Sequence, residues 1–147
     1  MSDIQIIAAG KIKKGPLLDL WHEYSKRMQN APVLHEIDDQ NPKSLEQKMS
    51  DLLDPKGVVI AMDEKGQELG SMAFAKMLED FDIQSIKPVQ FFIGAADGLP
   101  QIIRDNASRK LAFGKQTWPH KLVRIMLLEQ LYRAEKIIQG HPYHREG

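Results

Sequence analysis

The chain reads VQFFIG at residues 89–94, an apolar run that ends at a glycine. Val, Phe and Ile favour a strand, and a run that is apolar nearly throughout is typical of a parallel strand covered on both faces. A glycine directly after a buried strand lets the backbone turn sharply and approach a ligand closely. We therefore expect a buried strand over residues 89–93, with a candidate ligand-binding turn that begins at Gly94.

Similar apolar runs lie upstream, and stretches with helical periodicity separate them. The expected strands are Ile4–Ala9, Val33–Ile37, Val58–Met62 and Val89–Ile93. The expected helices are Leu17–Met28, Ser44–Leu53, Leu69–Phe81, Leu99–Lys110 and about Lys121–Gln139, with a short fifth strand or a loop over Leu111–Thr117. This alternation predicts an α/β fold with a mostly parallel sheet and helices on both faces. Since no linker or repeat divides the chain, we expect one domain over residues 1–147.

The last expected helix is apolar around most of its circumference. An apolar surface wider than the roughly 100° stripe of a surface helix must be covered on two sides. One side can pack on the sheet of its own chain, and the other can be covered by more of the same chain or by a second subunit. Because so small a domain has little material to wrap a central helix, we favour a homodimer.

Composition limits the class of protein. The chain has 147 residues, of which 42% are hydrophobic and 27% charged, as in ordinary soluble domains. No apolar run approaches the roughly 18 residues of a membrane span, and the N-terminus lacks the layout of a secretory signal. The absence of cysteine excludes disulfides and thiolate metal sites. We expect a cytoplasmic protein without a membrane segment.

The charges are unevenly distributed along the chain. Residues 1–98 hold 11 Lys and Arg against 16 Asp and Glu, whereas residues 99–147 hold 9 against 4. A basic segment on an acidic body can contact phosphate locally while the whole protein avoids indiscriminate nucleic-acid binding. An ordinary fluctuation of charge explains the same numbers, so composition leaves both interpretations open.

Three loops are candidates for a ligand site, because ligands bind outside the carboxyl ends of parallel strands. They follow the third strand at Met62, follow the fourth at Gly94, and span Phe113–Trp118. Together they could hold an adenosine-containing cofactor, although each alone is more often a plain turn. The chain has neither GxGxxG nor GxxxxGK[ST], so a Rossmann site or a P-loop has no support. Asp63 and Glu64 could act as an acid/base pair, or as solvated or capping residues.

The chain ends HPYHRE at residues 141–146. Tyr143 can stack on an unpaired base, and His144 and Arg145 can reach a phosphate or a base edge. The alternative is a disordered polar terminus, which is common at chain ends. We expect no metal site, even with His120 as a third ligand, because Pro142 disfavours the helix that would place His141 and His144 on one face.

Taken together, these motifs resemble the RlmH group of SPOUT methyltransferases, over essentially the whole chain. The segments that carry the resemblance are Ala8–Lys11, Glu23–Arg27, Phe92–Gly94, Phe113–Arg124, Glu129–Ala134 and His141–Glu146. The resemblance implies a dimeric α/β enzyme with a C-terminal trefoil knot, which composition and periodicity cannot predict. It also implies that S-adenosylmethionine methylates N3 of a pseudouridine in large-subunit ribosomal RNA of assembled ribosomes.

The resemblance also assigns residues. The implied cofactor contacts are Met62, Gly94, Phe113, Gly114, Lys115, Gln116, Thr117 and Trp118. The implied catalytic residues, near the target base, are Tyr143, His144 and Arg133, which can face cofactor held by the other subunit. His144 is one candidate base for removing the imide proton, and Arg133 or Arg145 could stabilise the resulting anion.

Two positions depart from the pattern of the group. Met62 stands where leucine is common, a change that nearly conserves volume. Ala95 stands where a second glycine is usual, and its Cβ would cost about 1 kcal/mol if that position requires a positive φ. Two other functions therefore remain open: a non-catalytic ribosome-binding factor with a degraded cofactor site, and a metabolic α/β enzyme that binds a small nucleotide.

Overall fold

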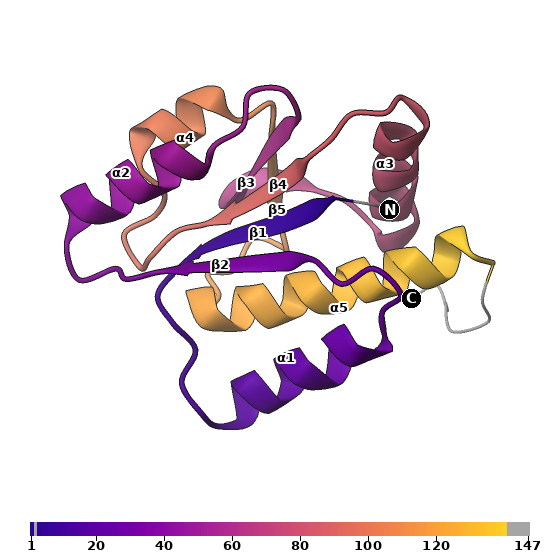
Figure 1. Cartoon of the computed structure of the whole chain (residues 1–147), viewed down its shortest axis with the longest axis horizontal. Coiled ribbons are helices and arrows are strands. Elements are labelled where there is room, and N and C mark those ends of the chain that lie inside the picture. The colour runs from indigo at the N-terminus through magenta and orange to yellow at the C-terminus, as the bar shows by residue number, and fades with distance from the viewer. Residues whose placement is uncertain (2, 141–147) are drawn as a thin grey trace.

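The structure, a computed structural model, describes residues 1 and 3–140. Within these residues five strands alternate with five helices, as expected for an α/β fold (Figure 1). The strands are β1 Ile4–Ala9, β2 Val33–Ile37, β3 Val58–Glu68, β4 Val89–Ile93 and β5 Arg109–Ala112. The helices are α1 Pro16–Arg27, α2 Pro42–Leu52, α3 Ser71–Ile83, α4 Gln101–Asn106 and α5 His120–Ile138. None of these helices is long and apolar enough to cross a membrane.

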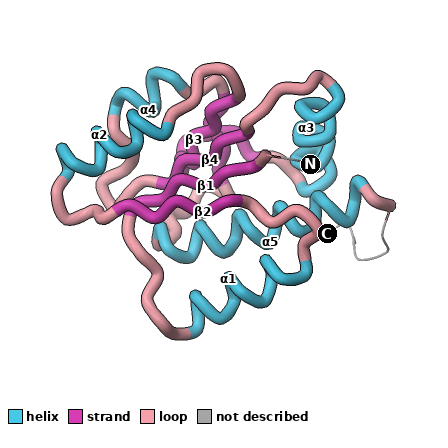
Figure 2. Tube along the Cα trace, viewed as in Figure 1, coloured by secondary structure: helices cyan, strands magenta, loops and turns pink. Residues whose placement is uncertain are grey.

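The strands form one parallel sheet in the order β2-β1-β4-β3-β5 (Figure 2). Strand β4 lies at its centre, where Phe91 is paired with Ile6 of β1 on one side and with Ile60 of β3 on the other. All five residues of β4 are buried, which confirms the prediction made from its apolar sequence. The turn at Gly94 therefore begins at the middle of the sheet's carboxyl edge.

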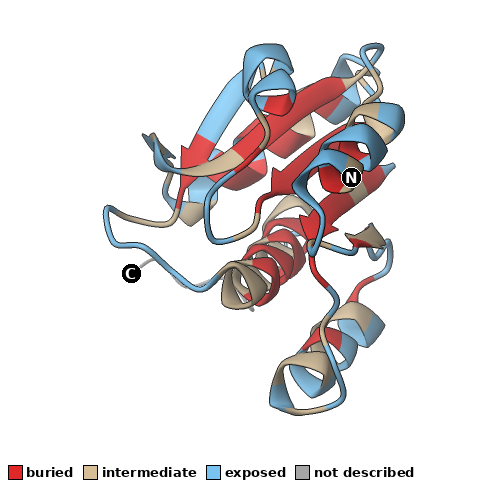
Figure 3. Ribbon diagram, turned by 90° about the vertical axis from the view of Figure 1, so that its left-hand side faces the viewer, coloured by how far each residue is buried: buried red, intermediate tan, exposed pale blue. Residues whose placement is uncertain are grey.

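Helices cover both faces of the sheet, and each face has its own core. Phe91 belongs to the core formed with α1, α3 and α5, whereas its neighbour Phe92 belongs to the core formed with α2 and α4 (Figure 1). This division follows from the alternation of side chains along a strand. The buried residues are concentrated in the sheet and on the helix sides that face it (Figure 3).

Helix α5 is covered by its own chain to a greater extent than we expected. The sheet lies on one side of it, and α1 and α3 pack against its other sides (Figure 1). The rings of Tyr24 in α1 and Tyr132 in α5 are 6.0 Å apart, and Glu135 accepts hydrogen bonds from the backbone N–H groups of Gln29 and Asn30. The apolar character of α5 is therefore explained within one chain. The homodimer therefore stays a prediction, and the apolar surface of α5 is no longer evidence for it.

Strand β3 differs from the prediction, which ended it at Met62. It continues to Glu68, with a register shift in which Met62 and Gln67 are both paired with Leu111 of β5. Residues 63–66 therefore form an excursion from the sheet, next to its carboxyl edge. A Cβ on Gly66 would lie 2.6 Å from the carbonyl carbon of Lys110, so the excursion requires glycine at this point.

Helix α4 is shorter than the predicted Leu99–Lys110. It ends at Asn106, because Ser108 donates its backbone N–H to the carbonyl of Val59 and so begins the pairing of β5 with β3. A short fifth strand is present, but it covers Arg109–Ala112, so it begins two residues before the predicted Leu111–Thr117 and the rest of that segment is a loop. It brings the following loop, residues 113–119, beside the ends of β3 and β4.

Candidate functional site

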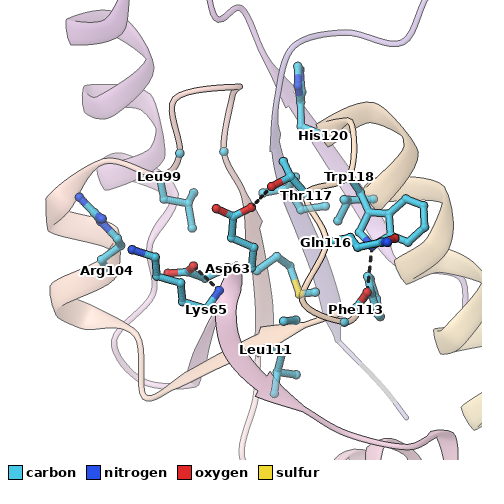
Figure 4. Close-up of a pocket in the computed structure, with 18 of the residues that line it drawn as sticks. Asp63, Lys65, Leu99, Arg104, Leu111, Phe113, Gln116, Thr117, Trp118 and His120 are labelled. Atoms are coloured by element: carbon cyan, nitrogen blue, oxygen red, sulfur yellow. Dashed lines mark hydrogen bonds between the residues drawn. The ribbon is translucent and has the colours of Figure 1, made fainter.

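A cavity of about 370 Å³ opens at the carboxyl ends of β3, β4 and β5 (Figure 4). Three loops form it: the excursion of β3, the β4–α4 turn and the β5–α5 loop. The lining residues that the sequence singled out as cofactor contacts are Met62, Gly94, Phe113, Gly114, Gln116, Thr117 and Trp118. Lys115, the remaining predicted contact, is exposed and does not line the cavity. The three candidate loops thus converge as predicted.

The β4–α4 turn is closed tightly by glycine. A Cβ on Gly94 would lie 2.5 Å from the carbonyl carbon of Gly98 and 2.7 Å from the backbone nitrogen of Leu99. Gly98 takes the positive φ of the turn, 95°, and donates its N–H to the carbonyl of Ala95 at 2.9 Å. The backbone of this turn therefore lies directly against the cavity.

Ala95 fits this turn without backbone strain. Among the described residues other than glycine, only Asp3 and Ser85 have a positive φ. Ala95 is half-buried and packs against the core on the α2 and α4 side of the sheet. The cost that would follow from a positive φ at this position does not arise, so Ala95 is no reason to regard the site as degraded.

The β5–α5 loop presents backbone groups to the cavity. Gly114 has a φ of 92°, and the indole Nε1 of Trp118 donates to the carbonyl of Phe113 at 2.8 Å, which closes the loop on itself. Across the described part of the chain, the backbone N–H groups of residues 114–117 make no hydrogen bond. They are available to a ligand that offers acceptor atoms.

Apolar and polar side chains both line the cavity. Ile93, Leu99, Leu111 and Val123 are among the apolar ones. An apolar lining with a few convergent backbone donors is typical of small-molecule sites. The arrangement can therefore hold a planar ring by apolar contact and orient it through backbone hydrogen bonds.

The two carboxylates that begin the excursion of β3, Asp63 and Glu64, bond to the loops rather than form a catalytic pair. Asp63 accepts the backbone N–H of Lys65 at 2.9 Å, which is a local turn cap. Glu64 accepts a hydrogen bond from the hydroxyl of Thr117 and so ties the excursion of β3 to the β5–α5 loop (Figure 4). The capping interpretation of Asp63 is confirmed, and Glu64 joins two walls of the cavity.

His120 also lines the cavity, a role that we did not predict from the sequence. It is the first residue of α5, and its Nε2 is buried without a hydrogen-bond partner, 3.9 Å from Oδ2 of Asp39. Burial lowers the pKa of His120 below its usual range, Lys121 and Arg124 lower it further, and Asp39 opposes them. Asp39 follows β2, so only the assembled sheet brings it to His120. No group of three or more side chains in the described ranges could hold a metal ion.

The predicted catalytic residues are not brought to this cavity by the described part of the chain. Arg133 lies on α5 and donates from Nε and Nη2 to Oε1 of Glu129, at 3.1 and 2.7 Å. It is absent from the cavity lining. Tyr143 and His144 lie outside the described residues, as does the third tail residue, Arg145.

Known proteins of similar sequence are similar over nearly the whole chain. A family described as "Predicted SPOUT methyltransferase" matches residues 2–144. The chain is 44% identical to the ribosomal RNA large subunit methyltransferase H of Paramagnetospirillum magneticum, with 95% of this chain and 97% of the relative covered. It is also 44% identical to the protein of the same name from Rhizorhabdus wittichii, with 98% and 99% covered.

Solved structures of low sequence identity share the fold. A probable methylase family protein from Haemophilus influenzae has a TM-score of 0.62 at 10% identity, with 99% of this chain and 71% of that one covered. The SpoU methyltransferase AviRb from Streptomyces viridochromogenes, in complex with AdoMet, has a TM-score of 0.53 at 13% identity, with 95% and 59% covered. Fold, cavity position and sequence agree: the chain belongs to the SPOUT methyltransferase family.

Proposed function

We propose that this protein transfers the methyl group of S-adenosylmethionine to large-subunit ribosomal RNA, and that its target is N3 of a pseudouridine in the assembled ribosome. The observation that carries the proposal is the cavity of about 370 Å³ lined by the predicted cofactor contacts, in a chain 44% identical to full-length large-subunit rRNA methyltransferases. The alignments with these relatives cover 95–98% of this chain and 97–99% of the relatives. The reaction class follows from the family, and the exact nucleotide is the finer part of the proposal.

The described residues fit the cofactor. The cavity volume falls in the range of roughly 300–1,000 Å³ that small-molecule sites occupy. The free backbone N–H groups of residues 114–117 can pair with the acceptor atoms of an adenine, and Leu111 and Ile93 can contact its ring. Gly94, which has no side chain to enter the cavity, lines it at the β4–α4 turn. When bound, S-adenosylmethionine supplies an electrophilic sulfonium methyl group.

The chain's own task is to position the RNA base and to remove a proton. The imide N3–H of the base must lose its proton before nitrogen can attack the methyl group. We assign His144 as the candidate base and Tyr143 as a stacking surface for the target ring, as the family resemblance implies. Arg133 or Arg145 then stabilises the negative charge on the imide.

Arg133 supports a site shared by two subunits. It lies 10 residues after Val123, the last residue of α5 that lines the cavity, so about 15 Å along the helix separate it from the cavity of its own chain. If Arg133 acts at the target base, that base must sit against the cavity of a second copy of the chain. We therefore propose a homodimer in which one subunit holds the cofactor and the other contributes catalytic residues.

The proposal extends to three general properties. Residues 1–147 work as one domain, whose C-terminal segment forms the trefoil knot expected of the family. The enzyme acts in the cytoplasm, where assembled ribosomes are found. Catalysis requires no metal, because positioning and a reactive sulfonium donor account for the chemistry.

The test is methyl transfer from radiolabelled S-adenosylmethionine to ribosomes from a strain that lacks this protein, with mass spectrometry of the modified rRNA fragment. We expect one methyl group on N3 of one pseudouridine. His144→Ala, which removes the base, and Tyr143→Ala, which removes the stacking ring, should reduce turnover by about 10²-fold or more and leave cofactor affinity near normal. Unchanged turnover in both variants would remove the tail from the chemistry, and methylation of a protein or a small molecule would overturn the proposal.

A non-catalytic ribosome-binding factor is the alternative from a different class. Its basis was strain at Ala95, and the structure has no such strain at this position. Calorimetry with S-adenosylmethionine separates the two functions, since a degraded site would release no heat at accessible concentrations. We expect binding in the micromolar range that is usual for enzyme cofactors and substrates.

A further inference from the structure

The loop between β1 and α1 carries an unusual concentration of positive charge. Residues 10–15 read GKIKKG, and Lys11, Lys13 and Lys14 are all exposed. Within the described residues none of the three forms an ion pair with a carboxylate. The chain as a whole has a formal net charge of zero, and the segment before residue 99 is acidic. Three unpaired lysines among six residues are therefore a local feature that the overall charge does not explain.

The backbone beneath these lysines is fixed from inside the protein. Arg124 of α5 is fully buried and donates from Nη2 to the carbonyls of Ala9 and Gly10, at 3.0 and 2.9 Å. Its Nη1 donates to Oε2 of Glu36 at 2.6 Å, and the same oxygen accepts the backbone N–H of Ile12 at 2.8 Å. These hydrogen bonds fix the backbone of residues 9–12, which carries the first of the three lysines and directly precedes the other two. A backbone that is already ordered also loses less entropy when its side chains bind.

The lysine loop begins at the edge of the cavity. A Cβ built on Gly10 would lie 3.5 Å from Nε2 of His120 and 3.5 Å from Cε of Lys121. His120 lines the cavity, at the end opposite to Leu111 in Figure 4. Lys121 adds a fourth positive charge beside the loop. Two carboxylates lie beside the loop: Glu36, which accepts the N–H of Ile12 and pairs with Arg124, and Asp39, whose Oδ2 is 3.9 Å from Nε2 of His120.

We propose that Lys11, Lys13, Lys14 and Lys121 bind phosphates of the RNA strand that flanks the target nucleotide. The proposal rests on the function proposed above, and it names the surface that holds the substrate. An RNA base placed in or against the cavity has phosphates one to three nucleotides away, and the loop starts within side-chain contact of the residue at the cavity's edge.

Phosphate is the ligand that these side chains favour. Lysine acts as a point charge on a flexible stem, which suits phosphates of variable geometry. Residues 10–15 contain no aromatic side chain for base stacking and no amide for reading a base edge. The loop is therefore suited to positioning a strand rather than to recognising its sequence.

The test compares two triple variants with equal loss of charge. The first is Lys11→Ala, Lys13→Ala and Lys14→Ala. The matched control is Lys48→Ala, Lys56→Ala and Lys87→Ala, in which exposed lysines of α2 and of the loops before β3 and β4 are removed, away from the cavity. For each, kcat and KM for assembled ribosomes from a strain lacking the protein are measured between about 50 and 300 mM salt.

We expect the loop variant to raise KM about tenfold at roughly 100 mM salt and to reduce the slope of log KM against log salt by about two to three. Its kcat and its affinity for S-adenosylmethionine, measured by calorimetry, should stay at the wild-type values, as should all properties of the control. Lys11, Lys13 and Lys14 are exposed, so folding is retained in both variants.

An unchanged KM and salt slope in the loop variant would overturn the proposal. A higher KM with an unchanged salt slope would also overturn it, because the loop would then contact ribosomal protein rather than phosphate. If the wild-type enzyme transfers no methyl group, the proposed function fails instead. Binding of the same variants to assembled ribosomes, measured by filter retention over the same salt range, then still decides whether the loop holds RNA.

Discussion

At the level of single residues, Gly94 shows how the absence of a side chain shapes the site. Its Cβ would meet backbone atoms of Gly98 and Leu99 at 2.5 and 2.7 Å, and backbone cannot rotate away as a side chain can. The whole turn would therefore have to move. Because the turn forms one wall of the cavity, this movement would reach the cofactor.

Replacement of Gly94 by alanine should thus impair binding as well as stability. We expect a loss of about 1–3 kcal/mol in the free energy of unfolding, as for other overpacked sites, and at least a tenfold loss of affinity for S-adenosylmethionine. Urea unfolding and calorimetry measure the two quantities. Gly70→Ala is the control, because a Cβ at Gly70 meets no atom within 4 Å and its φ is −67°. Wild-type cofactor affinity in Gly94→Ala would contradict this account of the turn.

His120 predicts a pH dependence of stability. Burial lowers its pKa in the folded protein below the value of about 6.5 expected in the unfolded chain. Below that pH the unfolded chain binds a proton that the folded protein does not, so stability decreases as the pH falls from about 6.5 toward the folded pKa.

A comparison with His120→Gln isolates this contribution. The wild-type protein should lose more stability than the variant between pH 7.5 and pH 5.5, measured by urea unfolding at both pH values. Equal losses would show that His120 does not titrate differently in the two states. A greater loss in the variant would mean that the ion pair with Asp39 dominates over burial.

Those cavity residues that carry a local sequence signal could be predicted from the sequence. A glycine after a buried strand and the loop of residues 113–118 both indicated the site, and Lys115 was the one cofactor candidate that does not line it. The fit of Ala95 could not be predicted, because it depends on Gly98 taking the positive φ of the turn. The proximity of His120 to Asp39 could not be predicted either, because the two residues are far apart in the sequence.

At the level of elements, Arg124 joins α5 to the ends of β1 and β2. Its side chain is fully buried, whereas that of Glu36 is 28% exposed. This asymmetry determines which substitution is more damaging. Loss of the Glu36 charge leaves a buried guanidinium without its counter-charge, while loss of Arg124 leaves a carboxylate that water can reach.

We therefore expect Glu36→Gln to destabilise the protein by about 3 kcal/mol, and Arg124→Met by less. The double variant should be more stable than Glu36→Gln alone, since no buried charge remains. Urea unfolding of the four proteins forms a double-mutant cycle that measures the coupling. Additive effects of the two substitutions would mean that the pair does not anchor the β1–α1 loop.

The order and type of the elements could be read from the sequence, because apolar runs and helical periodicity are local signals. The extension of β3 to Glu68 could not, since it depends on two separate pairings with Leu111 across a polar excursion. The early end of α4 has a similar cause, because Ser108 bonds to Val59 on a strand that lies far away in sequence.

At the level of the whole molecule, the proposed shared site requires two copies of the chain. Helix α5 is covered within one chain, so its apolar surface does not by itself predict the dimer. The stronger reason is the separation of about 15 Å along α5 between Arg133 and Val123, which lines the cavity of its own subunit. Trp118 at the cavity is also 39% exposed, as a large apolar side chain near an interface would be in an isolated chain.

Sedimentation equilibrium should accordingly give twice the chain mass of 16.7 kDa at micromolar concentration. In a mixture of the Gly94→Ala and His144→Ala proteins, assayed at an S-adenosylmethionine concentration too low to fill the Gly94→Ala cavity, re-associated hybrids should regain part of the activity if the site is shared. A species of 16.7 kDa with full activity would contradict the shared site.

The claim on which the rest depends is that the cavity at the ends of β3, β4 and β5 holds S-adenosylmethionine. A crystal structure of the protein with this compound tests it most directly. The account predicts density for the adenine between Leu111 and the backbone of residues 114–117, with the remainder of the molecule along the turn at Gly94. An empty cavity, with the compound bound elsewhere on the protein, would contradict it.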